Sequence, residues 1–290
     1  MALLPFLFLA MTTAQPSAWT SGPDGDLALV PFKSAPYPHA SRAEGLRTKT
    51  AFYPREEHYS DPTVGVFVPK GFRSGRTVNF VVHFHGHNNH VEQVFQQYDL
   101  PRQMHASGLN AVLLVPQGPR DVPDSGFGKL ENDPGSLEAM LQEALGFLAT
   151  SGRVPTGTRI GHVALTTHSG GFWVTASILG RNELAGKLTD VILFDSSYGG
   201  LAMIADWCAA DSHRRLISIC TDHLGHRNAQ LIALLQKRHV AARVLLEEDL
   251  TLAEVAKRGV LIVLTTTLEH NDVIAKRNYF ADWLRPCGWR

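Results

Sequence analysis

Short apolar runs alternate with longer amphipathic stretches along most of the chain. The apolar runs predict buried strands over 78–84, 110–115, 163–165, 191–194, 215–220 and 260–264, with a shorter strand over 240–246. The stretches between them predict helices over 91–105, 135–149, 172–179, 202–210, 228–238, 252–258 and 273–284. Strands that alternate with helices are typical of an α/β fold. We therefore predict a mostly parallel central sheet with helices on both faces.

The region before the first strong strand has a different pattern. Residues 15–46 are rich in Pro, Ser, Gly and Ala, which predicts an irregular lead-in. Polar and apolar residues alternate over 50–59 and 63–68, with Asp61-Pro62 between them, which predicts two antiparallel N-terminal strands. No interdomain linker follows, so we expect 47–290 to form a single α/β domain.

The first residues have the pattern of a targeting segment. Residues 1–11 are almost wholly apolar, and Thr12-Thr13-Ala14 supplies the small residues that a signal peptidase reads. The run is too short to span a bilayer. We therefore predict a signal peptide over 1–14 and an exported protein, periplasmic or extracellular, with no stable membrane insertion after its removal.

Composition excludes some functions and leaves others open. Hydrophobic residues make up 44% of the chain and the formal net charge is zero, so we expect a globular protein that does not bind nucleic acid. The spacing of Cys208, Cys220 and Cys287 does not match a zinc site. An exported protein could join Cys208 to Cys287 and leave Cys220 in its strand. Three unpaired buried thiols are the alternative.

Polar residues follow several of the predicted strands at their carboxyl ends. Because parallel strands bring these ends to one edge of a sheet, we expect the polar residues to meet there. The residues concerned are His85, Gly86, His87, Ser169, Asp195, Asp222 and His270.

Ser169 lies at the junction of a predicted strand and a predicted helix. The sequence Thr167-His168-Ser169-Gly170-Gly171 predicts a sharp turn that exposes the serine, with helix N–H groups that favour a developing negative charge. The pattern departs from Gly-x-Ser-x-Gly at Thr167, whose side chain must fit against the helix. An ordinary helix-capping serine is the alternative.

A serine nucleophile needs a base and an acid. His270 follows the last strand and is the best candidate base. We favour Asp195 as the acid because it ends an apolar run, where an unpaired carboxylate would be costly. Asp222, in a looser turn, is the alternative acid, and Asp272 is expected to cap the last helix.

Four histidines, His83, His85, His87 and His90, lie close together in the sequence. A metal site would need their side chains, but no acidic residue joins them, and we expect no metal. An oxyanion loop would instead need a backbone N–H group, which His87 or Asn88 could supply.

Taken in order, these motifs resemble the α/β-hydrolase superfamily, and in particular secreted bacterial esterases, from about residue 50 to the end. The resemblance implies that Ser169 is the nucleophile and His270 the base. It also implies that Gly170 and either His87 or Asn88 donate the oxyanion-hole N–H groups. The fold supports many substrates and does not choose one.

We therefore predict a serine hydrolase that cleaves a small or polymeric ester through an acyl-enzyme, without a cofactor. An amidase or peptidase would use the same residues. Because Thr167 departs from the usual pattern, a non-catalytic binding protein is an alternative. The four clustered histidines make a metal-binding protein a further alternative. Phe127 and Tyr198 are candidates for an acyl pocket, although both could equally be core or rim aromatics. The sequence leaves the oligomeric state open.

Overall fold

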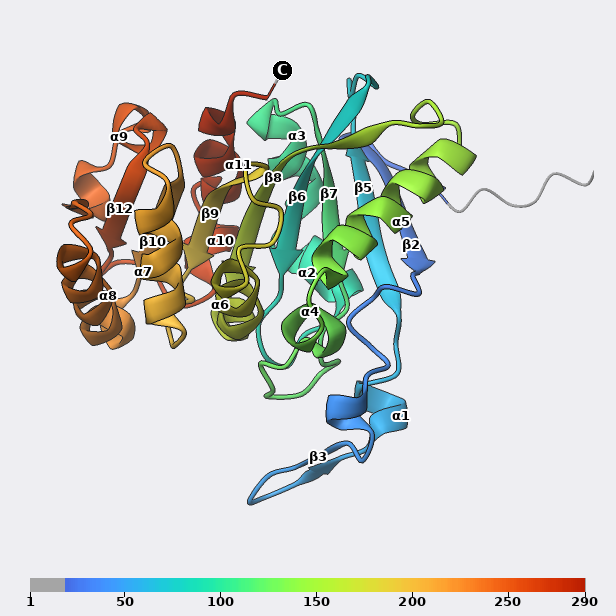
Figure 1. Cartoon of the computed structure of the whole chain (residues 1–290), viewed down its shortest axis with the longest axis horizontal. Helices are drawn as coiled ribbons and strands as arrows, with labels where there is room; N and C mark the ends of the chain where they lie inside the picture. Colours follow the sequence, from blue (N-terminus) through green and yellow to red (C-terminus); the bar gives the residue numbers. More distant parts are fainter. Residues whose placement is uncertain (1–18, 290) are drawn as a thin grey trace, which may run out of the picture.

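The computed structural model describes residues 19–289, and the predicted signal peptide lies outside them. Within this range a ten-stranded sheet has the order β1-β2-β5-β7-β6-β8-β9-β10-β12-β11 (Figure 1). Its strands are β1 Trp19–Ser21, β2 Gly25–Pro31, β5 Thr63–Pro69, β6 Thr77–Phe84, β7 Ala111–Pro116, β8 Arg159–His168, β9 Leu188–Phe194, β10 Arg215–Cys220, β11 Ala242–Leu246 and β12 Gly259–Leu264.

The sheet is antiparallel at one end and parallel elsewhere. The pairs β1–β2, β2–β5 and β5–β7 are antiparallel. Every pair from β7 through β6, β8, β9, β10 and β12 to β11 is parallel. The carboxyl ends of these parallel strands therefore lie along one edge. The predicted α/β class, with its mostly parallel sheet and antiparallel N-terminal strands, is confirmed.

Helices cover both faces because the strands are apolar on both faces. In β9, Val191 and Leu193 belong to one core cluster, and Ile192 and Phe194 to the other. The first cluster includes residues of α4 Gly128–Asn132, α5 Ser136–Thr150, α6 Phe172–Gly180, α7 Leu201–Ala210 and α8 Gly225–Lys237. The second includes residues of α2 Val91–Gln97, α3 Leu100–Ser107, α9 Leu252–Ala256, α10 Asp272–Ala275 and α11 Tyr279–Leu284. No helix within 19–289 is long and apolar enough to cross a bilayer.

The N-terminal segment differs from the prediction. Residues 15–46 were expected to be irregular, but β1 and β2 lie in this range and extend the main sheet. Glycines and prolines that indicated a loop lie at the turn before β2 and at its end, while 27–30 form an apolar run that pairs with β5. The expected strand over 50–59 is reduced to β4 Phe52–Tyr53, which pairs with β3 Leu46–Arg47 in a hairpin projecting from the body (Figure 1). Pro54 ends it and caps α1 Arg55–His58.

The proposed disulfide is not present. Cys208, Cys220 and Cys287 are free and buried. Cys208 belongs to the core cluster on one face of the sheet and Cys287 to the cluster on the other, so the sheet separates the two thiols. Burial raises the pKa of all three thiols to about 12, which keeps them protonated at neutral pH.

Candidate active site

Ser169 begins a tight turn between β8 and α6. The turn is a single 3-10 turn, η2 Ser169–Gly171, and Ser169 itself has a positive φ of 51°. A non-glycine residue rarely adopts this conformation, and it is often found where backbone strain serves function. The Ser196 hydroxyl donates a 2.8 Å hydrogen bond to the Ser169 carbonyl and helps to hold the turn.

The glycines of the turn explain how Thr167 fits where the usual pattern has glycine. Thr167 is fully buried, and its Oγ1 lies 3.3 Å from the Ser196 Oγ. A Cβ atom at Gly171 would lie 2.4 Å from that same Thr167 Oγ1. The absent side chain of Gly171 therefore makes the space that Thr167 occupies.

Asp195 and His270 form a close pair beside this turn. His168, the last residue of β8, pairs with Phe194, the last residue of β9, so Ser169 and Asp195 follow from adjacent strand ends. The Nδ1 atom of His270, in the segment after β12, lies 2.6 Å from Oδ2 of Asp195. Asp195 is fully buried, whereas 35% of the His270 side chain is exposed.

Thr221, at the end of β10, completes the surroundings of the carboxylate. Its backbone N–H donates to Oδ1 of Asp195 and its hydroxyl donates to Oδ2, and the donor–acceptor distance of each bond is 2.9 Å. Burial alone would raise the pKa of Asp195. The hydrogen bonds from His270 and Thr221 outweigh burial, so this pKa lies below its ordinary value. Asp222, the alternative acid, is exposed and begins the turn η3 Asp222–Leu224.

Sequence reasoning missed Thr221 and His223. The His223 Nδ1 lies 2.6 Å from the Thr221 hydroxyl, and its Nε2 lies 2.9 Å from the Tyr198 hydroxyl. Burial and the nearby Asp195 charge raise the pKa of Tyr198 to about 12. Asp195, His223 and His270 have ligand atoms within 4.8 Å of one another, but hydrogen bonds already occupy them. The signal in the sequence was Thr-Asp-His directly after a strand, which had been interpreted as a turn.

His168 lies under the His270 segment. It is buried, and burial followed by the nearby His270 lowers its pKa to about 4, so it is neutral at pH 7. Its Nε2–H donates to the His270 carbonyl with a donor–acceptor distance of 3.0 Å, and its Nδ1 lies 3.2 Å from the Tyr98 hydroxyl oxygen. His168 therefore holds the backbone that carries His270.

The four clustered histidines contact four different partners. His83 contacts the Thr166 hydroxyl, His85 the Gly86 carbonyl, His87 the Ser125 hydroxyl and His90 the Asp121 carboxylate. Their side chains do not converge on one point, so they do not form the metal site that their spacing allowed.

The backbone after β6 approaches the serine closely. A Cβ atom at Gly86 would lie 2.7 Å from the Ser169 Cβ, and one at Gly170 would lie 2.3 Å from Cδ2 of His87. The N–H group of Asn88 donates to the Val122 carbonyl over 3.0 Å. The Asn88 N–H is therefore occupied, which leaves His87 as the better of the two predicted donors.

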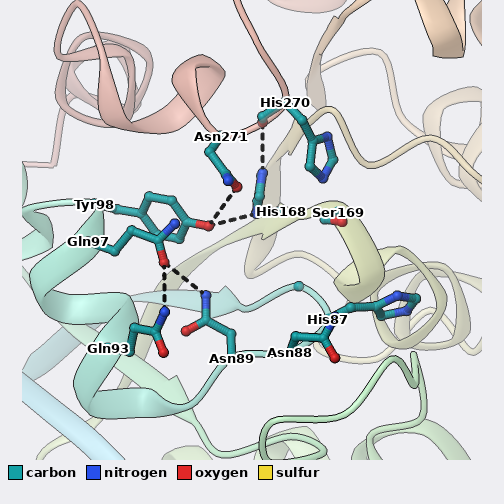
Figure 2. A pocket seen from close by; sticks show the side chains of 11 residues that line it. His87, Asn88, Asn89, Gln93, Gln97, Tyr98, His168, Ser169, His270 and Asn271 are labelled. Atoms are coloured by element: carbon teal, nitrogen blue, oxygen red, sulfur yellow. Dashed lines mark hydrogen bonds between the residues drawn. The ribbon is translucent and has the colours of Figure 1, made fainter.

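An open cavity of about 420 Å³ lies beside Ser169. Figure 2 shows Ser169 and the His270 ring close together on one side, and Tyr98, Gln93 and Gln97 on the other. The lining residues are Gly86, His87, Asn88, Asn89, Gln93, Gln97, Tyr98, His168, Ser169, His270 and Asn271.

Neither of the two predicted substrate-binding aromatics is among the residues that line the cavity. Phe127 is only 1% exposed and packs against Phe84 and His85, so it is a core residue and does not line the cavity. It fills the space beside Gly118, where a Cβ atom would lie 2.5 Å from its ring. Tyr198 is half-buried beside His223 and His270, and its hydroxyl interacts with the Ser169 side chain, so it adjoins the serine although it is not among the cavity-lining residues.

Comparison with known proteins bears on the fold. No protein-family model matches the sequence, and no curated protein matches it. Among solved structures, the feruloyl esterase module from Clostridium thermocellum, a point mutant complexed with sinapinate, is 15% identical. The match covers 77% of this chain and 82% of that one with a TM-score of 0.52. An S-formylglutathione hydrolase from Agrobacterium tumefaciens is 12% identical, with 93% and 95% covered and a TM-score of 0.47. The match to the feruloyl esterase module, together with the strand order of the sheet, shows that the chain has the α/β-hydrolase fold.

Proposed function

We propose that this protein is a serine hydrolase that cleaves an ester bond through an acyl-enzyme. The observation that carries the proposal is the 2.6 Å contact between His270 and the buried Asp195, with His270 and the strained Ser169 lining the same cavity. A nucleophile, a base and a group that orients the base are the parts that such a reaction requires.

Each residue has a separate role in this proposal. The Ser169 hydroxyl attacks the ester carbonyl, and His270 takes its proton through Nε2 and returns it to the leaving alcohol. Asp195 accepts the Nδ1–H of His270, which keeps Nε2 free to act as the base. Water then attacks the acyl-enzyme by the same route, and the acid is released.

The negative charge that develops on the carbonyl oxygen needs N–H donors. We assign this role to the backbone N–H groups of Gly170 and His87. Gly170 is the second residue of η2, and the first N–H groups of a helical turn have no partner within it. The His87 ring lies directly over Gly170, so the two residues adjoin at the serine.

We favour an ester over an amide because the feruloyl esterase shares the fold. An amidase or peptidase would use the same residues on a poorer leaving group. Export remains part of the proposal and rests on the apolar segment 1–11 and the small residues that follow it.

Labelling with a fluorophosphonate probe tests the proposal directly, because such a probe reacts with an activated serine. We expect the wild-type protein to be labelled, and Ser169→Ala and His270→Ala to lose labelling and hydrolysis of 4-nitrophenyl acetate while remaining folded by circular dichroism. Labelling that persists in Ser169→Ala, or a folded wild type that is never labelled, would contradict the proposal.

A further inference from the structure

We infer that the cavity beside Ser169 binds an uncharged, polyhydroxylated part of the substrate, such as a sugar or another polyol. This inference rests on the proposed function, because it names the substrate class of the same site. It comes from the chemistry of the cavity wall.

The wall is built from neutral hydrogen-bonding groups. Five carboxamides and one phenol line the cavity, from Asn88, Asn89, Gln93, Gln97, Asn271 and Tyr98. No Asp, Glu, Lys or Arg is among the lining residues. The wall therefore offers many donors and acceptors but no fixed charge.

Apart from His270, which pairs with Asp195, the histidines that line the cavity do not give it a positive charge. Burial lowers the pKa of His168 to about 4, and burial also lowers the pKa of His87. Both rings are therefore largely neutral at pH 7. An anionic substrate group would find no guanidinium or ammonium group here, although such groups are the usual partners of carboxylates and phosphates.

The carboxamides retain capacity for a ligand. Gln97 Oε1 accepts long hydrogen bonds of 3.4 Å from both Asn89 Nδ2 and Gln93 Nε2. Asn271 Oδ1 accepts one of 3.3 Å from Tyr98. Within residues 19–289, no hydrogen bond uses Gln97 Nε2, Gln93 Oε1 or Asn271 Nδ2.

These free groups match vicinal hydroxyls. Each hydroxyl is one donor and two acceptors, and a carboxamide offers both functions. Gln93 and Gln97 are four residues apart on α2, so their side chains project from the same side of the helix. Figure 2 shows both with Tyr98 on the wall opposite His270. The cavity, at about 420 Å³, falls within the range of about 300–1,000 Å³ typical of small-molecule sites.

An apolar occupant fits this wall poorly. An alkyl chain or an aromatic acyl group in the cavity would cover the free amide groups without replacing their hydrogen bonds to water. Buried polar groups left without partners weaken binding. The wall therefore discriminates against apolar groups as well as against charged ones.

The test compares esters that share an acetyl group and differ in the alcohol. We expect kcat/KM of the wild type for monoacetylated methyl glucoside and methyl xyloside to exceed that for butyl acetate and for anionic O-acetyl-lactate by about tenfold or more. Gln93→Leu and Gln97→Leu should each lower the ratio of sugar ester to butyl ester by about fivefold, since each removes a hydrogen-bonding group from the wall. Gln236→Leu, at an exposed position of α8, is the matched control and should leave the ratio unchanged.

The outcomes separate this inference from the proposed function. If Ser169 reacts with the fluorophosphonate but butyl acetate or O-acetyl-lactate is cleaved as well as the sugar esters, the hydrolase stands and the polyol inference fails. The inference also fails if both glutamine variants keep the wild-type ratio. If Ser169 does not react and no ester is cleaved, the proposed function fails and the inference fails with it.

Discussion

The Nδ1 atom of His270 lies 2.6 Å from Oδ2 of Asp195, although 75 residues separate the two in the sequence. Asp195 is fully buried, and hydrogen bonds from His270 and Thr221 keep its pKa below the ordinary value in spite of burial. The carboxylate is therefore ionised at neutral pH and is placed to accept a hydrogen bond from Nδ1 of His270.

Asp195→Asn should lower kcat for ester hydrolysis by roughly three to four orders of magnitude, because an amide favours the wrong tautomer of the histidine. Asp222→Asn is the matched control. Asp222 is exposed and makes no contact with His270, so this variant should keep nearly full activity. Steady-state kinetics on 4-nitrophenyl acetate measure both. A larger loss in Asp222→Asn than in Asp195→Asn would reverse the assignment of the acid.

Thr221→Val should lower kcat/KM by about tenfold. The substitution removes the hydroxyl that donates to Asp195 Oδ2 and leaves the backbone N–H bond to Oδ1 in place. Because the lost hydrogen bond stabilises the ionised carboxylate, the acid limb of the pH–rate profile should move to higher pH. Thr221→Ser keeps the hydroxyl and should restore both the rate and the profile. A pH profile identical to the wild type in Thr221→Val would indicate a purely structural role for this side chain.

Much of the fold could be predicted from the spacing of apolar residues and from the alternation of strands and helices along the chain. Over 191–194 every residue is apolar, and over 216–220 every residue but Ser218 is apolar, which is the pattern of strands covered on both faces; these segments lie in β9 and β10. The prediction of an irregular lead-in was wrong because the apolar run within β2, over 27–30, is short and is flanked by the turn residues Gly22, Pro23 and Pro31. These local turn signals outweighed the apolar run, which becomes a strand by pairing with β5.

The candidate site was only partly predictable. Ser169, Asp195 and His270 each follow a strong strand, so topology alone directs them to one edge. The carboxamide wall was not foreseen. Gln93 and Gln97 lie on a helix whose apolar residues pack in the core, and nothing in the sequence shows that its polar side faces Asn271. For the same reason the sequence did not choose between a pocket position and a core position for Phe127, since a loop aromatic carries no sign of which way it points.

Gly86→Ala should abolish most esterase activity without unfolding the protein. A Cβ atom there would lie 2.7 Å from the Ser169 Cβ and 3.3 Å from its Oγ, so the nucleophile or the loop after β6 must move. Misplacing a nucleophile by about 1 Å can cost roughly 100-fold in rate. Gly225→Ala, where a Cβ atom meets nothing within 4 Å, is the control. The measurements are kcat/KM and the thermal midpoint. If Gly86→Ala keeps activity within threefold of the wild type, the backbone at residue 86 does not lie as close to Ser169 as the structure places it.

The stability of the fold should decrease as the pH falls from 7 to 5, because buried neutral histidines oppose protonation. His85 donates from Nδ1 to the Gly86 carbonyl, and its Nε2 accepts the Gly118 N–H. His168 is also buried, and its Nε2–H donates to the His270 carbonyl. Burial is the main cause that lowers the pKa of each to about 4.

The sign of this effect follows from proton uptake. An unfolded histidine titrates near 6.5, so between pH 6.5 and 4 the unfolded chain binds protons that the folded chain does not. Stability is therefore fully present above pH 6.5 and is lost as the pH falls, by about 2 kcal/mol per histidine at pH 5. Urea unfolding at pH 7 and pH 5 measures the loss. His85→Asn should be less stable at pH 7 yet lose about 2 kcal/mol less on acidification. His213→Gln, at a side chain that is 92% exposed, should lose as much as the wild type. An equal loss in His85→Asn and the wild type would mean that His85 is not the buried neutral group described here.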